Sequence, residues 1–255
     1  MVFLSIPYML GEDLDAVLFL GDYIYEYPAG GKAVRIPSGG WVLTLDDYRA
    51  RYALSDSSRT LLGATQEQWL DQSLQQASPG WNLIGQQTLF GQRDFKAGTG
   101  QSFWNDGWDG YPGARQRLTA SLIKHKVANP TILGGDVHEN SVGHIKADYN
   151  DANSANVGVE FCGTSISSRG GGNARRDERL TKNPHFIFAD GDRSGYGVVE
   201  ITPQRLTTTS RGGRCDAKGD THRNAGAIHG GSGSPSGPPH RLSPTLSTTT
   251  SILRP

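Results

Sequence analysis

The sequence has 255 residues, and its 25 basic residues balance 25 acidic ones, so the formal net charge is zero. This length can bury a core in one large or two small domains, and the balanced charge does not indicate a nucleic-acid partner or a polyanionic membrane surface. A hydrophobic content of only 35% with 34 glycines predicts a folded part diluted by loops or a disordered segment, and no apolar run approaches the roughly 20 residues that span a bilayer.

The N-terminal part contains one predicted strand and one predicted helix. The first residues are apolar, but they have neither a basic n-region nor a convincing cleavage site, so they do not predict a signal peptide. Residues 14–20 form a mostly apolar run that ends at Gly21-Asp22. Such a run predicts a buried strand that presents polar side chains at its C-terminal end. Further on, Thr44 begins a capping-box-like sequence that predicts a helix as far as Leu54.

Hydrophobic patterns further along the chain predict helices and strands in alternation. In the first of these helices, Trp69 and Leu70 are expected to face the core, together with Leu62 before it. The alternation indicates a layered α/β domain, in which the C-terminal ends of strands form the crevice where ligands bind. The predicted elements are helices at 65–76 and 112–126 and strands at 82–89, 130–133, 157–162, 186–189 and 196–201.

The composition changes after about residue 206. Residues 208–255 contain no Phe, Trp or Tyr, and 27 of these 48 residues are Gly, Ser, Thr or Pro. Such a segment cannot bury enough apolar surface to offset its chain entropy. We therefore expect a folded domain over residues 1–206 and a disordered tail over 207–255. Cys162 lies in an apolar run and is expected to be a buried thiol, and we predict no disulfide with Cys215.

The predicted strand end at Gly21-Asp22 is followed by Tyr25. A carboxylate at a strand end, with a phenol three residues on, can supply two oxygen ligands to one metal ion, and an ionised phenol suits a hard trivalent ion such as iron. The glycine lets the backbone approach a ligand closely. From this segment alone, a turn in which Asp22 caps backbone amides and the tyrosines pack the loop is an equally good interpretation.

A second predicted strand ends in Gly135-Asp136 and continues to His138 and Asn140. If this segment is extended, Asp136, His138 and Asn140 share one face, where a carboxylate, an imidazole and an amide oxygen can form a metal and phosphate site. Two Gly-Asp strand ends in one domain predict a single site built by Asp22 and Asp136. Metal ions bound there would polarise phosphoryl oxygens and lower the pKa of water from about 15.7 towards about 7.

A loop rich in aromatic residues extends from Trp104 to Tyr111 and could border this site. Within it, Asp109 is a possible ligand for calcium or for a hydrogen bond. We favour the alternative that the loop is a turn packed by its aromatic side chains.

Seven motifs occur in a fixed order between residues 12 and 206. The ordered series is far more specific than any single motif, and it resembles the PhoD family of alkaline phosphatases and phosphodiesterases. The resemblance implies a metallophosphoesterase α/β sandwich, with mixed sheets flanked by helices. It also implies hydrolysis of small phosphate mono- or diesters with iron and calcium, by proteins that are usually exported. The motifs are residues 14–27, 44–54, 109–112, 135–138, 160–168, 183–185 and 195–196.

The resemblance also implies roles for individual residues. Asp22 and Tyr25 match metal ligands, because Gly-Asp-x-x-Tyr is the pattern of purple acid phosphatases, and Asp136 and His138 match the second group of ligands. The position of His185 in the series would place it at the site, although a lone histidine is more often structural. Asn140 and Asp109 complete the set of residues expected to contact substrate or to support the ligands.

Two blocks of the PhoD family have no counterpart in this sequence. A Cys-containing block is expected before the first Gly-Asp strand, and a central block resembling Trp-Asp-Asp-His-Glu is missing between Leu54 and Arg59. These departures predict a truncated and internally deleted form of the fold, with an incomplete sandwich. Because a metal site depends on its fold, such losses weaken metal binding and stability together.

Two hypotheses for the function follow. The first is a metal-dependent phosphatase or phosphodiesterase, in which a metal-activated hydroxide attacks phosphorus and Asp22, Tyr25, Asp136 and His138 hold the metals. The alternative is a catalytically inactive remnant that lacks part of the metal site. A serine esterase has little support, because residues 164–168 lack a Gly-x-Ser-x-Gly elbow.

Overall fold

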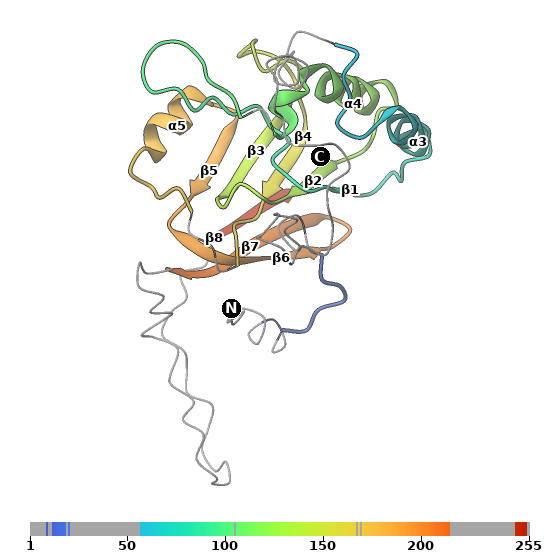
Figure 1. Ribbon diagram of the computed structural model, residues 1–255. Coiled ribbons are helices and arrows are strands. Elements are labelled where there is room, and N and C mark those ends of the chain that lie inside the picture. The colour runs from blue at the N-terminus through green and yellow to red at the C-terminus, as the bar shows by residue number, and fades with distance from the viewer. Residues whose placement is uncertain are drawn as a thin grey trace, which may run out of the picture.

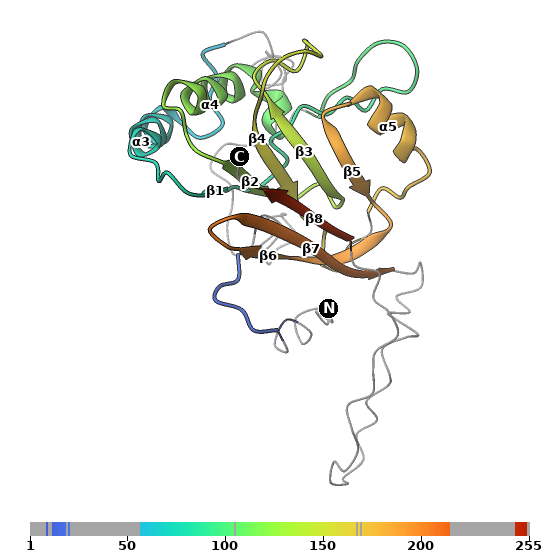
Figure 2. The same cartoon turned by 180° about the vertical axis from the view of Figure 1, so that it is seen from behind.

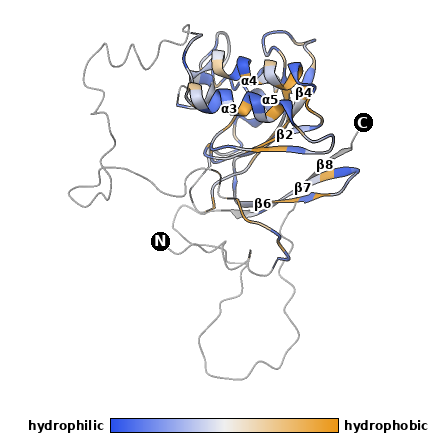
Figure 3. Cartoon of the chain, turned by 90° about the vertical axis from the view of Figure 1, so that its right-hand side faces the viewer, coloured by the Kyte–Doolittle hydropathy of each residue, from blue (hydrophilic) through white to orange (hydrophobic). Residues whose placement is uncertain are grey.

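The structure is a computed structural model that describes residues 9, 12–18, 20, 57–104, 106–166, 168 and 170–214, together with the backbone of 248–253. These residues form a layered α/β sandwich (Figure 1). A five-stranded mixed sheet lies in the middle, with helices on one face and a three-stranded antiparallel sheet on the other. The same layers are seen from behind in Figure 2 and from the side in Figure 3. The predicted α/β class, with mixed sheets and flanking helices, is confirmed.

Helices and strands alternate as far as β2, and most of the later described elements are strands. No helix among these residues is long and apolar enough to cross a membrane. In chain order the elements are α3 (Ala64–Gln75), β1 (Asn82–Gly85), the 3-10 helix η1 (Trp108–Gly110), α4 (Pro112–Lys124), β2 (Pro130–Gly134), β3 (Asn140–Lys146), β4 (Asn156–Cys162), α5 (Arg176–Lys182), β5 (Phe186–Asp190), β6 (Arg193–Ile201), β7 (Arg205–Arg214) and β8 (Thr248–Leu253).

The order of strands in the central sheet is β1-β2-β4-β3-β5. Strands β1, β2 and β4 are parallel, whereas β3 runs antiparallel to both of its neighbours, β4 and β5. The C-terminal ends of β1, β2 and β4 therefore meet at one edge of the sheet. This edge is where ligands bind in open α/β sheets.

Strand β2 is buried on both faces, so its side chains separate two cores. Ile132 is fully buried beneath Leu118 and Leu122 of α4, whereas Leu133 faces the second sheet and packs with Leu206 of β7. Alternate residues of a strand point to opposite faces, which explains why two adjacent apolar residues serve two different layers. Figure 3 shows hydrophobic residues along the strands between the helices and the second sheet.

Helix α4 follows the prediction closely. Pro112 occupies the start of the helix, where its missing N–H costs no hydrogen bond, and Ala114, Leu118 and Leu122 form the buried face. In helix α3 the expectation for Trp69 was wrong, because its side chain is 60% exposed. Leu70 and Leu74, four residues apart, define the inward face, and a residue adjacent to Leu70 is turned about 100° away from it.

Two strand predictions in the first half of the domain differ from the structure. The described part of 14–20 contains no strand, and Leu18 is 63% exposed. An apolar run forms a buried strand only when it pairs with the edge of a sheet. Strand β1 is the edge strand on that side of the described sheet, and the described part of 14–20 does not pair with it. The strand predicted at 82–89 ends at Gly85. The helix predicted from Thr44 lies outside the described residues.

The predicted end of the folded part at residue 206 was wrong. Strand β7 continues to Arg214 and pairs with β6 on one side and with the backbone of β8 on the other. Composition failed here because Thr, counted as a tail residue, is β-branched and favours strands. Leu206 also anchors β7, since its side chain is fully buried between the two sheets.

Candidate active site

The turn that follows β2 carries the second predicted ligand group. Asp136 and His138 have left-handed backbone conformations, with φ of 72° and 52°. Non-glycine residues rarely adopt this region, although Asp and His are among those that tolerate it. The expectation that Asp136, His138 and Asn140 share one face of an extended segment was therefore wrong. Strained backbone of this kind costs about 1–3 kcal/mol per residue and concentrates at functional sites.

Gly135 brings an N-terminal segment against this turn. A Cβ at this position would collide with the carbonyl oxygen of Leu20, so only glycine permits the close approach. A Cβ at Gly85, at the end of β1, would in turn be in ordinary van der Waals contact with the Leu20 side chain. The described chain therefore reaches the C-terminal edge of the sheet two residues before Asp22, which itself lies outside the described residues, as does Tyr25.

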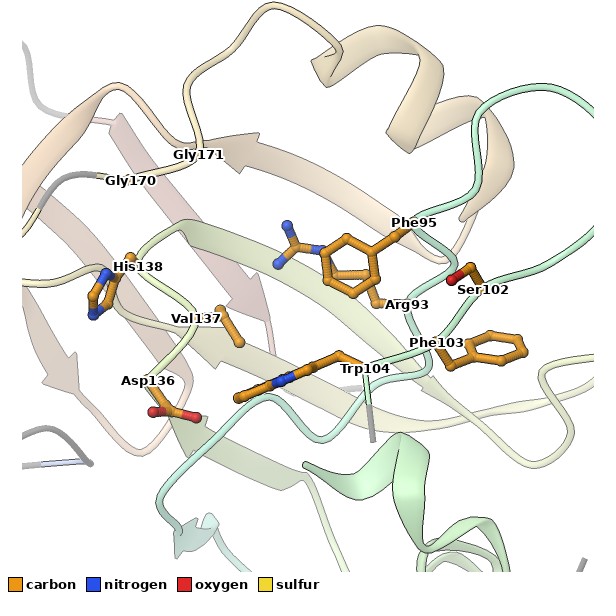
Figure 4. A pocket seen from close by; sticks show the side chains of 10 residues that line it. All are labelled: Arg93, Phe95, Ser102, Phe103, Trp104, Asp136, Val137, His138, Gly170 and Gly171. Atoms are coloured by element: carbon orange, nitrogen blue, oxygen red, sulfur yellow. The ribbon is translucent and has the colours of Figure 1, made fainter. Parts of the chain in front are cut away.

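A cavity of about 600 Å³ opens in front of the turn (Figure 4). Asp136 and His138, both half-buried, line one side of it, and the loop after β1 forms the other. The Trp104 indole extends from that loop towards Asp136 and Val137. Trp104, at one end of the aromatic loop, thus borders the cavity, whereas Trp108 is buried against Phe90, as expected for a turn packed by aromatic side chains. The lining residues are Arg93, Phe95, Ser102, Phe103, Trp104, Asp136, Val137, His138, Gly170 and Gly171.

Asn140 is not one of the lining residues. Its side chain is buried at the first position of β3, where its Oδ1 accepts a hydrogen bond of 3.3 Å from the backbone N–H of Thr164. This bond ties the start of β3 to the segment that follows β4. The structure thus places Asn140 behind the site.

The other predicted side chains hold the backbone that leads to Arg93. The ring Nε2 of His185 lies 2.8 Å from the carbonyl oxygen of Gln92. Burial lowers the pKa of His185 to about 4, so the ring is neutral near pH 7. Asn183, from the same motif, accepts a bond of 2.8 Å from the Asp94 N–H and donates one of 3.1 Å to the Asp94 carbonyl. These two residues fix the chain on both sides of Arg93.

Asp109 fixes Arg93 from the opposite direction. Its Oδ2 accepts a hydrogen bond of 3.0 Å from the Arg93 backbone N–H, and its Oδ1 lies 2.5 Å from Nη1 of Arg115. Burial raises the pKa of Asp109, and the Arg115 guanidinium opposes that shift. Asp109 therefore supports the wall of the cavity and is not one of its lining residues.

Sequence reasoning did not identify Arg93, whose guanidinium lines the cavity. The residue is 7% exposed, and its Nη2 lies 3.3 Å from Oε1 of Glu139. No spacing rule indicates an arginine in the segment 90–94, because the residues that position it come from distant parts of the chain. The only available signal was the presence of a charged residue shortly after a run of buried apolar ones.

A metal ion would find two donors among the described lining residues, the Asp136 carboxylate and the His138 imidazole. A carboxylate oxygen and an imidazole nitrogen suit ions such as iron or zinc. The described residues contain no group of three His, Cys, Asp or Glu side chains that could hold a metal. The donor chemistry therefore fits half a site, and its other predicted ligands are Asp22 and Tyr25.

Glu160 of β4 provides a testable pH dependence. Its carboxylate is fully buried and accepts bonds of 2.6 and 2.8 Å from the N–H groups of Phe90 and Gly91. Burial raises the pKa of Glu160 from 4.5 to about 7; these two bonds and Arg115 oppose the shift, and Asp109 adds to it. A raised carboxyl pKa gives stability that is complete below 4.5 and is lost as the pH rises through about 7.

We expect Glu160→Gln to remove the pH-dependent contribution of Glu160 to the stability of the protein. The difference in unfolding free energy between pH 4.5 and pH 8 should shrink by on the order of 3 kcal/mol relative to the unsubstituted protein. Urea unfolding at several pH values measures it. Parallel pH profiles for the two proteins would show that Glu160 does not titrate in this range.

The fold and the cavity define an α/β sandwich protein with a polar ligand site at the C-terminal edge of its parallel strands. The chain is 36% identical over 151 residues to alkaline phosphatase D of Bacillus subtilis (strain 168). The aligned region covers 58% of this chain and 26% of that protein. It also matches the solved "Structure of PhoD" with a TM-score of 0.58 and 34% identity, over 62% of this chain and 31% of that one. The matched part is thus about a quarter to a third of these relatives.

The model of the PhoD-like phosphatase family matches residues 3–58 and 53–210. The chain belongs to this family. The match consists of two pieces that overlap at residues 53–58, the position at which the sequence predicts a missing central block. The predicted resemblance to the family is therefore confirmed.

Proposed function

We propose that this chain hydrolyses phosphate mono- or diesters in the cavity at the C-terminal end of β2. The observation that carries the proposal is the turn with Asp136 and His138, two left-handed residues that face a cavity of about 600 Å³ in a member of the PhoD-like family. Strained donors at a strand end are typical of metal and catalytic sites.

Asp136 and His138 would hold metal ions together with Asp22 and Tyr25. Leu20 packs against Gly135, and the two residues of chain between Leu20 and Asp22 can span at most about 7 Å. When bound, metal ions polarise the phosphoryl oxygens and make hydroxide available near neutral pH. The aromatic side chains of Phe95 and Trp104 would shield the reacting phosphate from bulk water, since both line the cavity.

Iron and calcium are the metal ions that we propose. A phenolate at Tyr25 suits trivalent iron, and the carboxylates of Asp22 and Asp136 suit either ion. The substrate is a small phosphate ester, because the cavity is of the size that takes one small molecule.

The second candidate function is an inactive remnant of the family. The observation in its favour is the two-piece family match that meets at residues 53–58, because the missing block is expected to contribute polar groups to the site. Such a remnant would retain the cavity and at most weak affinity for metal.

Turnover of the purified chain on p-nitrophenyl phosphate and bis(p-nitrophenyl) phosphate tests the proposal. We expect hydrolysis that is lost after treatment with a chelator and restored by added iron and calcium. Asp22→Asn should reduce it to the chelated level. Asp177→Asn is the matched control, because Asp177 has an 86% exposed side chain on α5. Turnover that survives both chelation and Asp22→Asn would contradict the metal-dependent mechanism, and no turnover in any protein would favour the remnant.

A further inference from the structure

We propose that Arg93 forms an oxyanion-binding site in this cavity, which takes a phosphate-sized anion without requiring bound metal. The site lies in the same cavity as the proposed hydrolysis, but it does not depend on it. Both the active enzyme and the inactive remnant would retain it.

The position of Arg93 is fixed to a degree that surface arginines lack. Its backbone N–H is bonded to Asp109, and the residues on either side are held by His185 and Asn183. The Phe95 ring stacks on the guanidinium at 4.5 Å from the ring centroid. Figure 4 shows the guanidinium reaching across towards the turn with Val137 and His138. A donor held in this way loses little entropy when it binds a ligand.

The hydrogen-bonding capacity of Arg93 is not satisfied within the protein. Its Nη1 is buried and has no hydrogen-bond partner among the described residues. A buried donor without a partner costs about 1–3 kcal/mol, more if it is charged. Arg93 itself lines the cavity, so a ligand there is the available partner.

The charges around Arg93 leave a cation in excess. Glu139 is shared between two arginines, with Oε1 3.3 Å from Arg93 Nη2 and Oε2 2.9 Å from Arg179 Nη2. The side chains of Arg93, Glu139 and Arg179 are 9%, 4% and 16% exposed, respectively. One carboxylate thus faces two largely buried cations, and buried charge is costly unless it is compensated.

Other acidic side chains near this cluster are already paired. Asp109 pairs with Arg115, Asp94 with Lys182 and Asp190 with Arg193. Asp136 also lines the cavity, but Glu139 is the carboxylate that the structure pairs with Arg93. The anion that would balance the cluster is therefore a ligand.

The chemistry of the donor selects a phosphate or a similar tetrahedral oxyanion. A guanidinium is planar, always charged and less strongly hydrated than a lysine ammonium, so its N–H donors suit the oxygens of a phosphoryl group. The pair with Glu139 uses Nη2, so Nη1 is left for the ligand.

Titration of the chelated 255-residue chain with inorganic phosphate, at constant ionic strength set by chloride, tests this proposal. Calorimetry and thermal unfolding should show saturable binding and a saturable rise in Tm. R93K keeps the charge beside Glu139 but loses the planar fork, and we expect phosphate affinity to fall about tenfold or more. R176Q, on the exposed face of α5, is the matched arginine control and should leave the affinity unchanged.

E139Q makes the test independent of the folding of R93K. Removing the competing carboxylate should strengthen phosphate binding several-fold, even though the protein without phosphate becomes less stable. A purely structural role for the cluster predicts lower stability in both variants with an unchanged phosphate-dependent rise in Tm. That result, or the absence of saturable binding to the unsubstituted chain, would overturn the proposal. Phosphate binding without turnover would instead retain this site and sink only the proposed hydrolysis.

Discussion

Asp136→Asn should lower phosphodiester turnover on the order of a thousandfold while the protein remains folded. A metal ion contributes several kcal/mol to stabilising charge in the transition state, and each 1.4 kcal/mol corresponds to a factor of ten in rate. Asparagine keeps the size of the side chain but removes the negative charge that holds a cation. The measurement is kcat/KM for bis(p-nitrophenyl) phosphate in metal-supplemented buffer.

The backbone at Asp136 makes this substitution a clean test. Its φ of 72° lies in the left-handed region, which asparagine tolerates as well as aspartate does. In the presence of a chelator, where bound metal adds no stability, we therefore expect the unfolding free energy to change by no more than about 0.5 kcal/mol. Activity within a few-fold of the unsubstituted protein would exclude Asp136 as a metal ligand.

Asp109→Ala should lower the unfolding free energy by about 3–5 kcal/mol. The side chains of Asp109 and Arg115 are 8% and 6% exposed, so removing the carboxylate leaves an uncompensated guanidinium in the interior. The Arg93 N–H loses its acceptor at the same time. Urea denaturation measures the loss, and it should exceed that of a typical single substitution.

The control is the double variant in which Asp109→Ala is combined with Arg115→Met. An apolar side chain can replace a buried ion pair at little cost, so the double variant should be more stable than Asp109→Ala alone. If the changes in unfolding free energy of the two single substitutions simply add in the double variant, the carboxylate and the guanidinium do not interact. The stabilising role assigned to this pair would then be wrong.

The regular elements that the sequence predicted well are those whose pattern is local. Helix α4 starts at Pro112 and buries residues four apart, and β2 is a continuous apolar run between two covered layers. Strand β3 was missed because Asn140 to Lys146 contains polar residues and a glycine, yet its pairing with β4 and β5 buries it. Helix α5 was also missed, since it buries none of its residues and therefore shows no apolar periodicity.

The site was predictable only where its residues belong to a local motif. Asp136 and His138 follow a strand within a short motif, so the sequence located them, although their left-handed backbone was not foreseen. The site depends equally on contacts between segments far apart in the chain. Arg93 is placed by Asp109, Asn183 and His185, and no local pattern records that convergence.

Metal content per chain, measured after gel filtration for the unsubstituted protein and for Asp22→Asn and Asp136→Asn, tests the central claim most directly. If the two Gly-Asp segments build one centre, the unsubstituted chain retains at least one ion of iron or calcium, and each substitution reduces that content to background. Metal that is absent from the unsubstituted chain, or retained in full by both variants, would contradict a shared metal centre at the end of β2.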